Sequence, residues 1–167
     1  MSVIIRPAES DDLVAIQLIY AHHVLHGTAT FELEPPDLAE MTTRYQALRD
    51  TGFPFLAAEL GGLVVGYGYA GPYRTRPAYR HTVEDSIYLH PSHCGQGIGR
   101  RLLARLIDEC AQQDLKQMVA VIGDSANAAS IRLHQQAGFR DVGTFRAVGY
   151  KFNRWLDTVL MQRALEK

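Results

Sequence analysis

The chain has 167 residues, 47% of them hydrophobic and 21% charged, which is the range of one globular domain. Seventeen basic and eighteen acidic side chains leave a net charge of -1, so no excess charge attracts nucleic acid or a membrane surface. Cys94 and Cys110 are too few for a disulfide framework and lack zinc-site spacing. We expect one cytoplasmic domain, residues 1–167, whose partner is a small molecule.

The first third of the chain predicts one strand followed by two helices. Residues 3–6 predict a short strand that begins with an apolar run at residues 3–5. Ser10 is predicted to cap a helix in which apolar residues from Leu13 to Val24 recur at helical spacing. A second helix is expected over residues 38–49, ending near Gly52.

The middle of the chain changes to the period of strands. Residues 55–59 and 63–69 flank the turn at Gly61 and Gly62 and predict an antiparallel hairpin, and residues 83–89 predict a further strand. After Gly99, apolar side chains gather on one face of an amphipathic helix.

The last third predicts three strands and one helix. Residues 119–122 are a continuous apolar run, which favours a fully buried strand with neighbours on both faces. A helix is expected over residues 128–137, between Asn127 as N-cap and Gly138 as its C′ residue. Final strands follow at residues 142–151 and 157–163. Together these elements predict an α/β (α+β) fold in three layers, with a mixed sheet of about six to seven strands and helices on both faces.

The most informative segment is a strand, a glycine-rich turn and a helix start over residues 88–103. Glycines let the backbone approach a ligand, and free N–H groups at a helix N-terminus attract phosphate. No Lys-Ser/Thr pair follows the glycines, which excludes a P-loop, and the spacing of Gly95, Gly97 and Gly99 does not fit the dinucleotide fingerprint. The turn is therefore expected to hold a pyrophosphate of another cofactor.

This segment resembles the signature of the GNAT superfamily of acetyltransferases, Arg/Gln-x-x-Gly-x-Gly/Ala at a helix start. Cys94, Gly97 and Gly99 occupy the matching positions, and Cys94 departs from the family's Arg or Gln. Because the family uses mainly the backbone N–H there, we expect pyrophosphate binding to survive. Residues 127–139 resemble a second family segment, in which an Asn, here Asn127, contacts the pantetheine arm.

The resemblance implies a GNAT fold with acetyl-CoA as cosubstrate and no metal. The cofactor-binding residues that it implies are Ser86, Ile87, Tyr88, Leu89, Cys94, Gly95, Gln96, Gly97, Ile98, Gly99, Arg100, Asn127, Ser130 and His134.

Four further segments narrow the resemblance to the phosphinothricin and methionine sulfoximine N-acetyltransferase branch. They are residues 28–32, 70–74, 82–88 and 148–157. The branch implies a homodimer and an acceptor that is a small amino-acid-like amine. Alternatives are an acetyltransferase for protein amino termini or other amines, and a non-catalytic sensor that binds acyl-CoA.

The resemblance also assigns catalytic roles. An α-amino group is largely protonated at neutral pH, so the reaction needs a base, and Glu84 matches the Glu proposed for it in the branch. We expect burial to raise the pKa of Glu84, and we expect Asp85 to face away from it, since neighbouring strand residues alternate. A backbone N–H near Ile87 or Tyr88 is expected to stabilise the oxyanion. His134 lies where many relatives carry a Tyr acid, and is expected to protonate the thiolate or only to bind.

We expect an arginine to bind the acceptor molecule, because a guanidinium pairs well with the acceptor's carboxylate or phosphinate group. Arg74 is the first candidate and Arg76 the second, both on one loop between strands. The histidines near residues 22–26 and 90–93 are interpreted as surface and loop residues, not metal ligands. The remaining substrate-binding residues, which the resemblance implies, are Phe31, Tyr73, Thr144, Val148 and Asn153.

Overall fold

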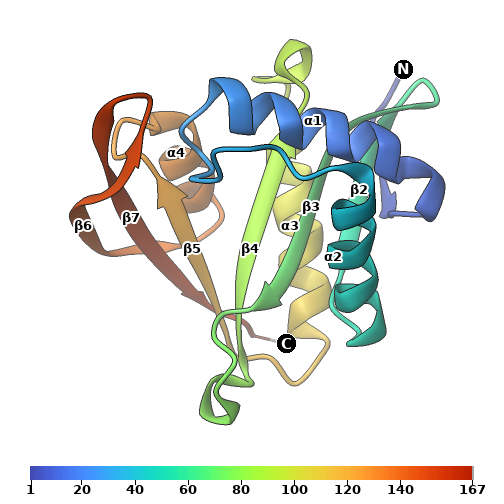
Figure 1. Ribbon diagram of the computed structural model, residues 1–167. Coiled ribbons are helices and arrows are strands. Elements are labelled where there is room, and N and C mark those ends of the chain that lie inside the picture. Colours follow the sequence, from blue (N-terminus) through green and yellow to red (C-terminus); the bar gives the residue numbers. More distant parts are fainter. Residues whose placement is uncertain (167) are drawn as a thin grey trace.

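The computed structural model describes residues 1–166, and a single seven-stranded sheet runs through its centre (Figure 1). The strand order is β1-β2-β3-β4-β5-β7-β6, and only the pair β4–β5 is parallel. This confirms the predicted mixed sheet. The strands are β1 (Ile4–Pro7), β2 (Phe55–Leu60), β3 (Leu63–Pro72), β4 (Thr82–Leu89), β5 (Gln117–Gly123), β6 (Arg140–Lys151) and β7 (Arg154–Ala164).

Helices cover both faces of this sheet, as predicted. α1 (Leu13–His26) and α2 (Leu38–Asp50) lie on one face, while α3 (Ile98–Ala111) and α4 (Ala128–Gln136) lie on the other (Figure 1). The amphipathic helix α3 buries its apolar stripe against β2, β3 and β4, so it covers the face of the sheet opposite α1 and α2. Short 3₁₀ turns occur at η1 (Ser10–Asp12), η2 (Pro77–Tyr79) and η3 (Pro91–His93).

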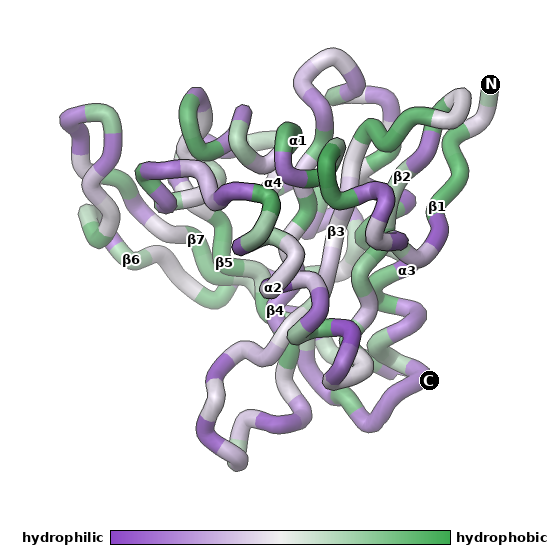
Figure 2. The backbone as a smooth tube through the Cα atoms, turned by 45° about the vertical axis from the view of Figure 1, so that its right-hand side comes forward, coloured by the Kyte–Doolittle hydropathy of each residue, from purple (hydrophilic) through white to green (hydrophobic). Residues whose placement is uncertain are grey.

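Two segments at the edge of the molecule are exposed. The loop that joins β3 to β4 projects beyond the sheet and is mostly hydrophilic (Figure 2). The hairpin of β6 and β7 lies at the left of the molecule in Figure 1, where β6 is the edge strand of the sheet. Among the described residues, no helix is both long and apolar enough to cross a membrane.

Three local predictions need correction. Ser10 does not cap α1, because residues 10–12 form a 3₁₀ turn that Glu9 and Asp12 close as a capping box. The strand predicted at residues 119–122 is not buried on both faces, because Val121 is 39% exposed and lines a cleft beside β4. The last strand begins at Arg154, since a tight turn with positive φ at Phe152 and Asn153 pairs its start with the end of β6.

The feature that positions the site is the parting of β4 from β5. Their parallel pairing covers only three residues of each strand and ends at Glu84 and Val119. Beyond this point the two strands diverge (Figure 1), while β4 stays paired with β3 as far as Leu89. One edge of β4 therefore loses its strand partner after Glu84, and its backbone becomes accessible to a ligand.

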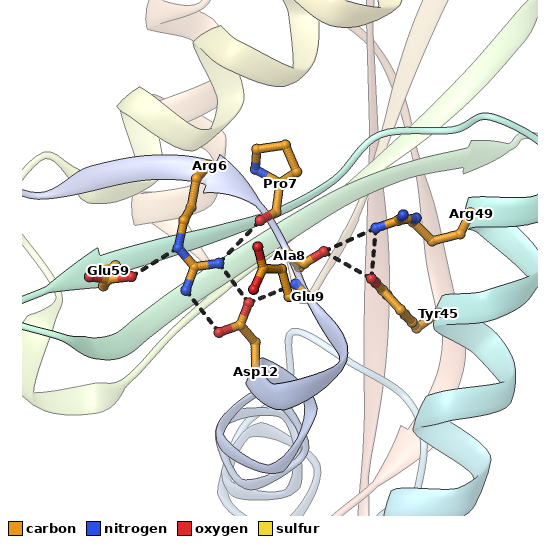
Figure 3. Close-up of polar contacts among 8 residues, drawn as sticks. All are labelled: Arg6, Pro7, Ala8, Glu9, Asp12, Tyr45, Arg49 and Glu59. Carbon is orange, nitrogen blue, oxygen red and sulfur yellow. Dashed lines mark hydrogen bonds and ion pairs between the residues drawn. The ribbon is translucent and has the colours of Figure 1, made fainter.

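An ionic network fixes the N-terminal strand to the start of α1 (Figure 3). The Arg6 guanidinium donates to both oxygens of Asp12 at 2.7 and 2.9 Å and to Glu59 at 2.9 Å. Beside it, Tyr45 and Arg49 of α2 donate to the carbonyl of Ala8 (Figure 3). β1, α1 and α2 are thus held together by bidentate and charge-assisted hydrogen bonds, the stronger kind.

Asp12→Asn should lower the free energy of unfolding by about 1–3 kcal/mol at neutral pH, because the Arg6 charge loses its buried partner. The hydrogen bond from Arg6 holds the pKa of Asp12 below its usual value, so its stabilisation is present above about pH 4 and is lost as pH falls through the folded-state pKa. Urea unfolding at several pH values checks this. The exposed neighbour Asp11→Asn is the control and should change little; equal losses in both variants would contradict the account.

Candidate functional site

A cleft of about 1010 Å³ begins where β4 and β5 part. It runs from the inner ends of the two strands to the glycine-rich turn, between α1 on one side and α4 on the other. This size fits a cofactor-sized ligand. The predicted cofactor residues that line it are Ser86, Ile87, Tyr88, Leu89, Cys94, Gly95, Gln96, Gly97, Gly99, Arg100, Asn127, Ser130 and His134.

The glycine-rich turn has the geometry of an anion cradle. Gly95 and Gly97 have φ values of 75° and 79°, and Gly97 is the N-cap of α3 without a side-chain cap. The first N–H groups of α3 are therefore left for a ligand. Cys94 is exposed beside them, and Ile98, the remaining predicted residue, is buried beneath the turn in the core. The arrangement fits a pyrophosphate.

Asn127 begins α4 on the other wall of the cleft. Its side-chain oxygen accepts from the backbone N–H of Ser130 at 3.2 Å, which confirms the predicted N-cap. This bond orients the side chain and leaves its NH₂ group to donate elsewhere, which suits an amide-rich arm such as pantetheine.

Glu84 is the last residue of β4 that pairs with β5, and its side chain is half-buried. Burial is the main cause that raises the pKa of its carboxyl to about 7, the charge of Asp85 adds to it, and the Arg74 charge opposes it. The predicted rise in pKa is confirmed. A carboxylate with this pKa is half deprotonated near neutrality, which suits a general base.

Asp85 points to the opposite face of β4, as predicted, and there it meets His134. Its Oδ2 lies 2.9 Å from His134 Nε2, and His134 Nδ1 lies 2.7 Å from the carbonyl oxygen of Ser130. Burial alone would lower the pKa of His134, but the hydrogen bond and charge of Asp85 outweigh it and raise that pKa. His134 is thus a fixed, buried side chain at the wall of the cleft.

The predicted arginines lie on the exposed loop between β3 and β4. The Arg74 guanidinium stacks on the ring of Tyr73 at 5.2 Å, and its charge acts on Glu84. Arg76 begins η2 farther along the loop and is exposed. The structure therefore brings Arg74 and Tyr73 toward Glu84, whereas Arg76 has no described contact with that group.

The ring of Phe31 packs directly against the backbone of two glycines, Gly123 and Gly149. A Cβ at Gly149 would lie 2.3 Å from the Phe31 ring and one at Gly123 would lie 3.1 Å from it, so both positions need glycine. Phe31 thereby joins the loop after α1 to the ends of β5 and β6. Thr144 and Val148 lie on β6 and Asn153 in the turn after it, with β5 and β7 between β6 and β4 in the sheet. Their substrate roles stay predictions.

Two features of the cleft are not predicted from the sequence. His23 is interpreted there as a surface residue. In the structure its Nε2 lies 2.7 Å from the carbonyl oxygen of Leu89, and the residue lines the cleft. The bond between Asp85 and His134 was also missed, although a carboxylate on an apolar strand face requires a buried partner. Within residues 1–166, no group of three His, Cys, Asp or Glu side chains is arranged to hold a metal.

Comparisons with known proteins agree with this geometry. Residues 18–139 match the model of the acetyltransferase (GNAT) family. The phosphinothricin N-acetyltransferase of Alcaligenes faecalis is 52% identical, covering 96% of this chain and 82% of that protein. The L-methionine sulfoximine/L-methionine sulfone acetyltransferase of Salmonella typhimurium is 44% identical, covering 98% and 95%.

A solved structure shows the same fold. It is the GNAT superfamily phosphinothricin acetyltransferase of Sinorhizobium meliloti in complex with acetyl-CoA, with a TM-score of 0.96 and 46% identity, covering 99% of this chain and 90% of that one. The predicted fold class and family are therefore confirmed.

Gly97→Ala should weaken acetyl-CoA binding by about tenfold, because a Cβ at φ 79° costs about 1–2 kcal/mol and displaces the N–H groups of the cradle. Isothermal titration calorimetry measures this. Gly52→Ala is the matched control: it has φ 82° at the end of α2, remote from the cleft, and should reduce stability without changing affinity. Unchanged binding in Gly97→Ala would exclude the turn as the pyrophosphate site.

Proposed function

Because the chain belongs to the GNAT family of acetyltransferases and is an acetyl-CoA-dependent N-acetyltransferase, we propose that it acetylates the α-amino group of a small amino-acid-like acceptor. The acceptor is of the phosphinothricin or methionine sulfoximine type, and Glu84 is the general base. The observation that carries the proposal is the place of Glu84, half-buried at the point where β4 parts from β5, with its pKa raised to about 7.

The chemistry follows from this placement. The acceptor arrives largely as an ammonium ion, and Glu84 takes its surplus proton directly or through one water. The amine nitrogen then attacks the carbonyl carbon of the thioester. The N–H groups on the open edge of β4 after Glu84, at Ile87 or Tyr88, suit the oxyanion that forms, because no β5 strand pairs with them.

The acceptor is proposed to be held by its anionic group. Arg74 supplies the guanidinium, since its charge acts on Glu84 and Tyr73 supports its planar group. Phe31, fixed against Gly149, supplies an apolar wall. We also propose that the acceptor contacts the remaining predicted substrate-binding residues at the outer part of its site. They are Arg76, Thr144, Val148 and Asn153.

We also propose that residues 1–167 act as one domain in a cytoplasmic homodimer. One continuous sheet carries every functional segment, and both cysteines are free thiols, with Cys94 exposed, as suits a reducing compartment. The dimer is supported by five large apolar side chains on the β6–β7 hairpin that are each at least half exposed, since exposed apolar side chains that gather on one element can mark an interface. They are Phe145, Val148, Tyr150, Phe152 and Trp155.

Glu84→Gln should lower kcat for methionine sulfoximine and phosphinothricin by about 10²–10⁴-fold, because the amine keeps its proton. In the wild type, kcat/KM should rise with pH through about 7, since the base works only when deprotonated. Thiol release from acetyl-CoA across pH 5–9 measures both.

The panel should include ordinary amino acids, polyamines and a peptide with a free amino terminus. Glu59→Gln, a carboxylate on β2 that pairs with Arg6, serves as the control and should keep the wild-type profile. Turnover on the peptide alone, or a Glu84→Gln variant with the wild-type rate, would contradict the proposal.

Trp155→Glu should convert the proposed dimer to monomers, because it places a charge at a side chain that is 67% exposed here and whose ring lies 5.0 Å from that of Tyr150, between centroids. Sedimentation velocity over a range of concentrations measures the change. Leu63→Glu, an equally exposed apolar residue on β3, is the control. A wild-type protein that sediments as a monomer would refute the dimer.

A further inference from the structure

Lys151 is a buried lysine at the end of β6. The residue is 3% exposed, and its Nζ donates to the carbonyl oxygen of Thr30 at 2.8 Å. Nζ also lies 5.1 Å from the centre of the Phe152 ring. Burial lowers the pKa of the amine, because an ammonium ion loses its hydration inside a protein. A lysine is rarely buried so completely unless a partner compensates for this loss, so the contacts of Nζ indicate its role.

Neutralising a carboxylate does not explain this position. The acidic group whose charge acts on Lys151 is Glu32, but Glu32 already has other partners. Arg44 donates to both of its oxygens at 2.7 and 3.0 Å, and the Tyr20 hydroxyl donates to it as well. The hydrogen bond that Lys151 itself makes goes to the backbone of Thr30. Lys151 therefore serves the loop after α1 rather than the charge of Glu32.

The loop after α1 meets the β6–β7 hairpin at two neighbouring points. Thr30 is followed by Phe31, whose ring packs on Gly149. Gly149 and Lys151 are two residues apart in the regularly paired end of β6, so they share one face of the strand. Consecutive loop residues thus contact the same face of β6, Thr30 through its carbonyl oxygen and Phe31 through its ring. A displacement of the loop along β6 would break both contacts.

The part of the loop that faces the cofactor is held by another strand. Thr28 and Ala29 line the cofactor cleft. Thr28 Oγ1 donates to Asp124, directly after β5, at 2.8 Å. A Cβ at Gly123 would lie 2.5 Å from the carbonyl oxygen of Thr28, so the two backbones are in close contact. The cofactor side of the loop therefore depends on β5 and not on Lys151.

We propose that Lys151 is a positioning residue for the acceptor: its hydrogen bond to Thr30 holds the Phe31 ring in place as a wall of the acceptor site. This inference rests on the proposed function in one respect, the contact between Phe31 and the acceptor. Lys151 acts through Phe31 and takes no part in the bond changes. Its loss weakens acceptor binding, whereas acetyl-CoA binding and proton transfer to Glu84 continue.

The first test is Lys151→Met, which keeps the length of the side chain and removes its charge and its donor. We expect KM for methionine sulfoximine to rise about tenfold, because a hydrogen bond from a charged group is lost. In the same variant, kcat and KM for acetyl-CoA should change by about twofold or less. Lys116→Met is the matched control: Lys116 is an exposed lysine that pairs with Asp114, and its variant should keep the wild-type values.

A double-variant cycle separates a role through Phe31 from a general effect on the fold. In a Phe31→Ala background, Lys151→Met should raise the acceptor KM by a further factor of about two at most, because the wall that Lys151 holds is already gone. Gly149→Ala leaves Lys151 in place, but its Cβ would lie 2.3 Å from the Phe31 ring, so it should also raise the acceptor KM. Full additivity in the cycle would overturn the proposal, and so would an unchanged acceptor KM in Lys151→Met or in Gly149→Ala.

Hydrogen exchange followed by mass spectrometry tests the contact without any acceptor. In Lys151→Met, peptides that cover residues 28–33 should exchange faster than in the wild type, while peptides from α3 keep the wild-type rate. Equal exchange of the loop in both proteins, or faster exchange throughout the chain, would overturn the proposal. If Glu84→Gln keeps full activity, or methionine sulfoximine is not acetylated, the proposed function fails, and the exchange result still decides whether Lys151 holds the loop.

Discussion

The structure depends on one constraint: β4 and β5 pair for only three residues before they diverge. A parallel pair that parts leaves unpaired backbone groups on the open edge of β4, and these groups need another partner. α3 packs on β4 and α4 packs on β5, and the loop after α1 contacts β5 and β6 through Phe31. The cleft and the residues that line it follow from this opening.

The two faces of β4 also carry different ionisable side chains beside the point where β4 and β5 part. Strand alternation directs Asp85 toward His134 of α4 and Glu84 to the other face of β4, so the two neighbouring carboxylates do not share one site. Each nevertheless feels the other, since the charge of Asp85 contributes to the raised pKa of Glu84. The Glu84 carboxyl on one face and the Asp85–His134 pair on the other are thus coupled electrostatically through a single strand.

The sequence predicts those features that depend on local patterns. The strands, the hairpin turn at Gly61 and Gly62, and the Asn127 cap follow from periodicity and turn chemistry, and the glycine-rich turn locates the cofactor. Contacts between distant segments are not predictable in this way. The hydrogen bond between Asp85 and His134 joins residues 49 positions apart. The ring of Phe31 packs against glycines that are distant from it in the sequence. Neither contact produces a pattern within a short stretch of sequence. The exposure of Val121 likewise depends on the parting of β4 from β5, because the residue lines the cleft that this parting opens.

The most direct measurement is a crystal structure of the complex with CoA and methionine sulfoximine. The account predicts the pantetheine arm between the diverging ends of β4 and β5, and the acceptor amine within hydrogen-bond reach of Glu84, directly or through one water. An acceptor amine bound away from Glu84, or a pantetheine arm outside the opening between β4 and β5, would contradict it.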